Sequence, residues 1–172
     1  MQQQEPTADG VTKWMVLLAW IAGLALVTYV FADLLEEQFN PNQSPTSQRN
    51  GSQVEVRLEQ NRAGHYVASG TINNQPVVFL LDTGATDVSI PAHLASELGL
   101  TPERKAYAQT ANGIVMIAET TIRSITLGDI QLTDVAANLN PGMQSDKILL
   151  GMSFLRQIEF TQKGNELVLR TL

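Results

Sequence analysis

One short stretch of the chain holds an acid in a setting that suits chemistry. Asp82, Thr83 and Gly84 directly follow the apolar run Val77–Leu81. A carboxylate at the end of a buried strand is poorly screened by water, and a glycine lets backbone N–H groups approach it closely. Such a carboxylate could act as a general acid or base. The plainer alternative is a turn aspartate that only caps backbone N–H groups, and Asp-Thr-Gly alone does not decide between the two.

A second apolar strand makes the chemical interpretation stronger. The apolar run Ile148–Leu150 lies some 65 residues after the triplet and is followed directly by Gly151. The hairpin sequence Thr110–Gly113 lies between the two apolar strands. This combination resembles the retropepsin-like aspartic proteases of clan AA. With Leu149–Leu155 and an N-terminal apolar helix, it is similar to the bacterial membrane-anchored, single-pass branch of that family.

The resemblance, which covers roughly residues 60–172, implies a role for each matching residue. It implies that Asp82 is catalytic and that the residues after it form the active-site turn and support a dimer axis. It also implies a flap hairpin that closes over the substrate, and support for the turn from the second apolar strand. The residues in these three groups are Thr83, Gly84 and Ala85 for the turn, Ala111, Asn112 and Gly113 for the flap, and Leu150 and Gly151 for the second strand.

The count of Asp-Thr-Gly triplets determines the mechanism that we expect. Aspartic proteolysis uses two carboxylates that share a proton, because two such groups about 3 Å apart do not both ionise easily. This chain has one triplet. The second Asp82 is therefore expected from a homodimeric partner on a two-fold axis, with an extended peptide or protein as substrate. The expected reaction needs no metal or other cofactor.

Other acids and the histidines are weaker candidates for the site. Asp87 is given a structural role by the resemblance, which implies an ion pair near this position. The remaining candidate acids are expected in turns or loops, and the two histidines show no metal-ligand spacing. These residues are Asp129, Asp134, Asp146, His65 and His93.

The N-terminal part of the chain contains a possible membrane anchor. Residues 14–32 carry no charge. As a helix, a run of this length is about long enough to cross a hydrocarbon core. A buried helix of a soluble protein and a cleaved signal peptide are the alternatives. Lys13 precedes the run, and this small charge bias places the N-terminus in the cytoplasm. The C-terminal part then faces the periplasm, from the bacterial inner membrane.

Four regions are predicted along the chain. Residues 1–13 form a polar tail, 14–32 a transmembrane anchor that contacts lipid, 33–53 a flexible linker, and 54–172 the protease domain. The stretch from Asn40 to Gln53 has no large apolar side chain to order it. It is therefore also a place where the enzyme could release itself by cleavage.

The domain is predicted to be mainly β, and its many short strands indicate a small barrel or a sandwich. The resemblance implies a closed or partly open retropepsin-like barrel with one short helix. Val54, Val56 and Leu58 alternate with charged residues, as in a half-buried strand. Tight hairpin turns are expected at 73–74, 111–113, 128–129 and 162–165. A helix is expected to begin at Pro91 and to stop at Gly99.

Composition excludes several classes of protein. A net charge of −6 without a basic cluster argues against nucleic-acid binding, and the absence of cysteine excludes disulfides, thiol nucleophiles and Cys-containing zinc sites. The leading hypothesis is a membrane-anchored aspartic endopeptidase. A peptide-binding module of the same fold that does not cut, and a structural β domain with a coincidental triplet, remain as alternatives.

Overall fold

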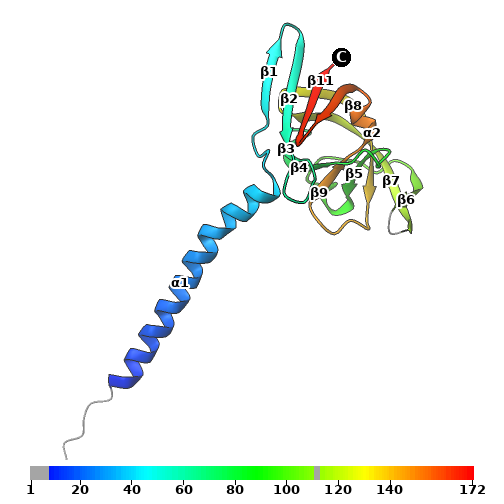
Figure 1. Ribbon diagram of the computed structural model, residues 1–172. Helices are drawn as coiled ribbons and strands as arrows, with labels where there is room; N and C mark the ends of the chain where they lie inside the picture. The colour runs from blue at the N-terminus through cyan, green and yellow to red at the C-terminus, as the bar shows by residue number, and fades with distance from the viewer. Residues whose placement is uncertain (1–7, 111–112) are drawn as a thin grey trace, which may run out of the picture. The chain divides into compact units, whose positions relative to one another are not determined.

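The computed structural model describes residues 8–110 and 113–172 (Figure 1). The chain divides into two compact units, the first ending at Glu37 and the second formed by Gln38–Leu172. The first consists of helix α1, which spans Ala8–Phe39 and so reaches two residues into the second unit. The second unit holds all the described strands.

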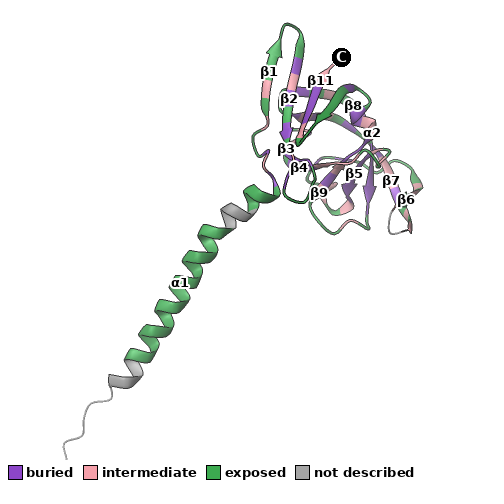
Figure 2. Cartoon of the chain, viewed as in Figure 1, coloured by how far each residue is buried: buried purple, intermediate pink, exposed green. Residues whose placement is uncertain are grey.

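Helix α1 is long and apolar enough to cross a membrane over Thr12–Phe39, a test that a signal sequence also passes. All described side chains from Thr12 to Phe31 are exposed (Figure 2). A core helix of a soluble protein would bury its apolar side chains, but no part of the most apolar stretch of α1 is buried. The exposure therefore argues against a soluble core helix.

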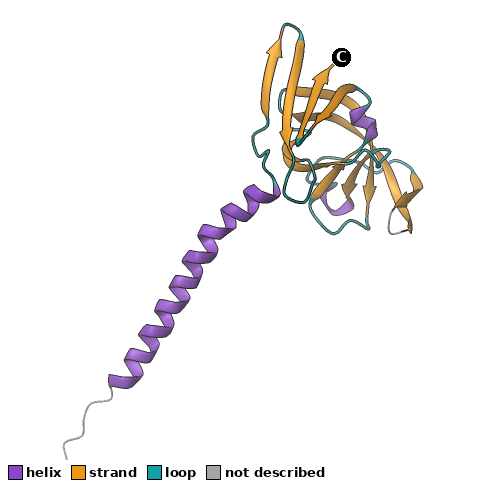
Figure 3. Cartoon of the chain, in the orientation of Figure 1, coloured by secondary structure: helices purple, strands orange, loops and turns teal. Residues whose placement is uncertain are grey.

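In the described part of the domain, the strands form two sheets (Figure 3). A four-stranded sheet has the order β1-β2-β11-β10, and a seven-stranded sheet has the order β3-β4-β9-β5-β8-β7-β6. The strands are β1 (Thr46–Asn50), β2 (Gln53–Glu59), β3 (Val67–Ile72), β4 (Gln75–Leu81), β5 (Val88–Pro91), β6 (Lys105–Thr110), β7 (Gly113–Leu127), β8 (Ile130–Asn140), β9 (Lys147–Leu150), β10 (Ile158–Lys163) and β11 (Glu166–Thr171).

The larger sheet closes on itself. Its first strand, β3, also pairs with β7, through Thr71 opposite Thr126 and Ile72 opposite Ile125. This contact joins the first strand of the sheet to its last strand but one and makes a barrel, with β6 left as an edge strand. The predicted mainly β, partly open barrel is confirmed, and the short helix α2 (Met152–Leu155) follows β9.

The core forms because apolar side chains alternate along the strands. Val54, Val56 and Leu58 all point into the core from β2, as the period of two predicted. Phe79 from β4 and Phe154 from α2 are the largest fully buried side chains. The strand that leads to Asp82 and the helix that follows Gly151 are therefore both fixed in the same core.

Three of the four predicted hairpin turns are present in the described residues. Asn73 and Asn74 join β3 to β4 with φ of +48° and +70°, a conformation that asparagine tolerates better than most residues. The turn at 128–129 joins β7 to β8. The turn between β10 and β11 is shorter than the predicted 162–165, because residues 162–163 pair with β11 and only 164–165 form the turn. Residues 111–112 of the remaining turn lie outside the described residues.

The helix predicted after Pro91 is shorter than expected. Only Ala92–Leu94 form a 3₁₀ turn, and a series of turns follows. The predicted stop at Gly99 is correct, because Gly99 has a φ of +61° and Leu100 N–H donates to Ala95 C=O at 2.8 Å. That bond pattern, which ends a helix, is a Schellman motif.

The segment 33–53, predicted to be a flexible linker, is ordered over much of its length, because residues 33–39 continue helix α1. Thr46–Asn50 form β1, paired with β2, and Asn40 and Asn42 are buried at 4% and 5% exposure. The segment from Asn40 to Asn50 has no large apolar side chain to bury. It is ordered instead by the side-chain hydrogen bonds of two asparagines and by the backbone pairing of β1 with β2.

Candidate active site

Asp82 begins a tight loop at the end of β4. Its N–H donates to the Leu150 carbonyl at 3.2 Å, and its Oδ1 accepts the N–H of Gly84 at 2.8 Å. Ala85 N–H then donates to the Asp82 carbonyl at 3.2 Å and closes the turn. Asp82 is partly buried, while Thr83 and Gly84 are exposed. The loop therefore holds the carboxylate in one orientation and leaves its tip open to another molecule.

Strand β9 lies between the two strands that this loop connects. It pairs in parallel with β4, Leu81 opposite Leu150, and antiparallel with β5, Ser89 opposite Leu149. Gly151 then passes directly under the loop, where a Cβ would lie only 2.3 Å from the Asp87 carbonyl oxygen. The structure thus brings Leu150 and Gly151 against the Asp82 loop and shows why this position lacks a side chain.

Helix α2 is hydrogen-bonded to the C-terminal part of the loop. Met152 N–H donates to Ala85 C=O at 2.8 Å, and Ser153 N–H donates to Thr86 C=O at 2.9 Å. The Ser153 hydroxyl accepts the N–H of Val88 at 2.9 Å. Sequence reasoning assigned no role to Ser153, although its place two residues after Gly151 was the available signal.

The predicted flap corresponds to the hairpin between β6 and β7. Thr110 pairs with Gly113, and the Thr110 hydroxyl donates to the Gly113 carbonyl at 2.8 Å. Gly113 has a φ of +108°, which suits glycine. Ala111 and Asn112, the other two predicted flap residues, lie outside the described residues.

The other candidate acids lie in different settings. His93 Nε2 is 2.8 Å from Asp146 Oδ1, so this histidine pairs with a loop acid and not with Asp82. Asp134 lies within β8 at a φ of +53° and not in a turn, whereas Asp129 is in a turn as expected. None of the ion pairs recorded among residues 8–110 and 113–172 involves Asp87. Within the same residues, no three His, Cys, Asp or Glu side chains gather closely enough to hold a metal ion.

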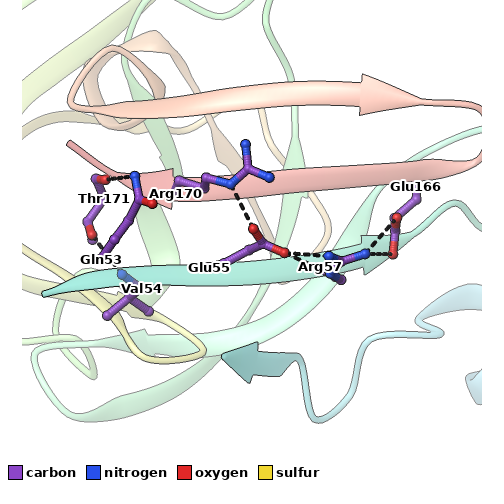
Figure 4. Close-up of polar contacts among 7 residues, drawn as sticks. All are labelled: Gln53, Val54, Glu55, Arg57, Glu166, Arg170 and Thr171. Carbon is purple, nitrogen blue, oxygen red and sulfur yellow. Dashed lines mark hydrogen bonds and ion pairs between the residues drawn. The ribbon is translucent and has the colours of Figure 1, made fainter. Parts of the chain in front are cut away.

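The clearest charge network belongs to the four-stranded sheet and not to the loop (Figure 4). On β2, Glu55 lies 2.7 Å from both Arg170 and Arg57, and Arg57 reaches Glu166 at 3.3 Å. The hydrogen bond from Arg170, followed by that from Arg57, holds the pKa of Glu55 below its usual value. These pairs tie β2 to β11.

Comparison with known proteins agrees with this geometry. Residues 68–157, which run from β3 past α2 and include Asp82 and Gly151, match the family described as gag-polyprotein putative aspartyl protease. The chain belongs to the retropepsin-like aspartic proteases. The crystal structure of a retropepsin-like aspartic protease from Rickettsia conorii matches with a TM-score of 0.58 and 26% identity, over 74% of this chain and 94% of that one.

Two curated relatives of this retropepsin-like chain are themselves uncharacterized proteins. One, from a Sinorhizobium species, is 32% identical over 122 residues, which are 69% of this chain and 52% of the relative. The other, from Rickettsia prowazekii, is 28% identical over 108 residues, or 61% of this chain and 46% of the relative. The chain thus spans about half the length of the curated relatives that it matches.

Proposed function

We propose that the chain is a membrane-anchored aspartic endopeptidase that works as a homodimer, with Asp82 of each protomer in one shared dyad. The observation that carries the proposal is the Asp82 loop, in which Gly84 N–H binds the carboxylate, the Leu150 carbonyl accepts the Asp82 N–H, and α2 donates two N–H groups to loop carbonyls. A turn aspartate in a purely structural role does not need this second layer of support.

The dyad follows from the family and from the number of carboxylates. Retropepsin-like proteases are typically dimers that act on peptides, and each chain here has one Asp-Thr-Gly. In the dimer, one Asp82 takes a proton from the attacking water while its counterpart donates a proton to the carbonyl oxygen of the scissile bond. The exposed tip at Thr83 and Gly84 leaves the loop accessible for that pairing.

An extended peptide is the proposed substrate. It binds as an added strand beneath the flap at Ala111–Gly113, with backbone hydrogen bonds for affinity and side-chain pockets for selectivity. Closure of the flap excludes water other than the one that attacks.

The proposed location is the bacterial inner membrane, with the protease domain on the periplasmic side. Helix α1 supports this placement by its length and exposure, and Lys13 supports a cytoplasmic N-terminus. Reaction of a single cysteine introduced at Gln162, in this cysteine-free chain, with a thiol reagent that does not cross the membrane tests the orientation. Labelling only after the cells are lysed would place the domain in the cytoplasm and overturn this part of the proposal.

The activity is tested with the full chain in lipid nanodiscs, incubated with a diverse peptide mixture between mildly acidic and neutral pH. Asp82→Asn is the test variant, and Asp129→Asn, which makes the same chemical change at an exposed turn, is the matched control. We expect cleavage by the unchanged chain and by Asp129→Asn, and none by Asp82→Asn. Equal cleavage by all three, or cleavage by none, would contradict the proposal.

A further inference from the structure

The segment just after α1 is held by a buried asparagine. The Asn42 side chain donates to the carbonyls of Glu59 and Val67, at 2.9 and 2.7 Å, and its Oδ1 accepts the Glu59 N–H at 2.7 Å. Asn42 is only 5% exposed. Its amide group therefore bridges the end of β2 and the start of β3, and an apolar side chain of similar size could not replace these bonds.

Asn40 and the backbone extend the same contact. Asn40 Nδ2 donates to the Ser69 hydroxyl at 3.0 Å, and Asn40 Oδ1 accepts the Asn42 N–H at 3.0 Å. Ser69 N–H donates to the Asn42 carbonyl, also at 3.0 Å, and Asn42 forms a parallel bridge with Ala68. The segment thus contacts β3 through one isolated bridge, at Asn42.

Phe39, the last residue of α1, is fixed as well. Its carbonyl accepts a hydrogen bond from Asn61 Nδ2 at 3.0 Å, and the Lys147 ammonium lies 3.5 Å from the centre of its ring. A cation at this distance from an aromatic ring is attracted to it. Lys147 begins β9, the strand whose other end supports the Asp82 loop.

We propose that residues Phe39–Asn42 are a latch, a segment by which the end of α1 is docked onto the strands around the active site, and that the latch protects the connection to the helix from proteolysis. Strand β3 receives the latch and pairs with β4, and the Tyr66 carbonyl accepts the N–H of Leu81, the residue before Asp82. The latch is thus one strand away from the catalytic loop.

The latch changes the expected tether between anchor and domain. A free connection over 33–53 could extend to about 70 Å, whereas the six residues 33–38 belong to helix α1 and span about 9 Å. A protease must also bind its substrate as an extended, unpaired strand. Within residues 40–50, Asn40 and Asn42 are buried and 46–50 are paired with β2, which leaves 43–45 as the unpaired part. The latched chain is therefore expected to stay on its anchor. This consequence rests on the proposed membrane anchor, whereas the latch itself does not.

The test uses the full chain in detergent micelles, in an Asp82→Asn background that removes any self-cleavage. An added protease of broad specificity is the probe, and mass spectrometry follows cuts within residues 40–53 relative to cuts in the turn at 162–165. Asn42→Ala is the test variant, and Gln43→Ala, at the exposed neighbouring position, is the matched control. We expect cuts at 40–53 to be at least about tenfold faster in Asn42→Ala than in the parent chain, and unchanged in Gln43→Ala.

Two further readouts keep the result clear if Asn42→Ala unfolds the domain. Asn40→Ala removes fewer bonds and should give a smaller increase in the same cuts. Hydrogen exchange in the parent chain should be slow at the N–H groups of Glu59 and Ser69, which donate to Asn42. Rapid exchange at both, or equal cutting in the asparagine variants and in Gln43→Ala, would overturn the latch. Because the probe is an external protease, neither result depends on whether the chain itself cuts peptides.

Discussion

Replacement of Gly151 by alanine tests how closely the Asp82 loop must be held. Gly151 has φ −90° and ψ −170°, so alanine can adopt its backbone conformation and the cost is steric alone. The added Cβ would lie 2.3 Å from the Asp87 carbonyl oxygen and 2.8 Å from that of Ala85. Carbon–oxygen contacts are ordinarily about 3.3 Å or longer, so the loop has to move by roughly 1 Å.

A shift of this size should reduce activity far more than stability. A displacement of about 1 Å at a catalytic group can cost about a hundredfold in rate, while overpacking costs about 1–3 kcal/mol in the free energy of unfolding. We therefore expect kcat of Gly151→Ala to fall by about two orders of magnitude at a temperature where the domain stays folded. Peptide cleavage gives kcat and KM, and thermal unfolding gives the stability.

Gly70→Ala is the matched control for this prediction. Its Cβ would lie 2.3 Å from the Thr126 carbonyl oxygen, the same degree of overlap with backbone, but at the β3–β7 contact and not under the Asp82 loop. It should lose stability and keep most of its activity per folded molecule. The reasoning is refuted if folded Gly151→Ala cuts as fast as the unchanged chain, or if Gly70→Ala loses kcat to the same extent.

Three further predictions concern single side chains. Ser153→Ala leaves the buried N–H of Val88 without its acceptor, so the free energy of unfolding in denaturant should fall by about 1–3 kcal/mol, and Ser153→Thr should recover most of it. Hydrogen bonding to Arg170 lowers the pKa of Glu55 in the folded state, so the stability that Glu55 contributes is complete above its unfolded pKa near 4.5 and is lost as pH falls through the lower folded value. The unfolding temperature, measured between pH 3 and 7, should therefore fall less steeply in acid for Glu55→Gln than for the unchanged chain. The same dependence on pH in both chains would count against this role of Glu55. Burial raises the pKa of Tyr66, and its buried hydroxyl has no hydrogen-bond partner among the described residues. Tyr66→Phe should therefore leave the free energy of unfolding unchanged or raise it by up to about 1 kcal/mol. A clear loss of stability would show that the hydroxyl has a partner.

The parts of the fold that sequence predicted are those encoded over short distances. The alternation in β2, the Asn73-Asn74 turn and the apolar strand before Asp82 each depend on neighbouring residues, and all three are present. The spacing of strands and turns predicts a small barrel or a sandwich, and the family resemblance selects the barrel, because no local pattern reveals that β3 returns to pair with β7.

The parts that sequence did not predict depend on polar contacts between distant residues. Ser153 meets Val88 across 65 positions, and Asn42 meets Val67 across 25. Hydrophobic periodicity does not predict such bonds. A polar stretch without large apolar residues is therefore predicted to be a linker. For this reason sequence predicts a linker where the structure has the buried Asn42 and strand β1, while it predicts the neighbouring strand β2 correctly.

The central claim is that one active site requires Asp82 from two chains, and mixing of protomers tests it most directly. The unchanged chain is co-assembled with increasing amounts of Asp82→Asn, and peptide cleavage is measured per unchanged chain. If both carboxylates are needed, activity per unchanged chain should fall to about half at equal amounts and to about a quarter with a threefold excess of the variant, as random pairing requires. Activity per unchanged chain that stays constant at every ratio would contradict the shared dyad.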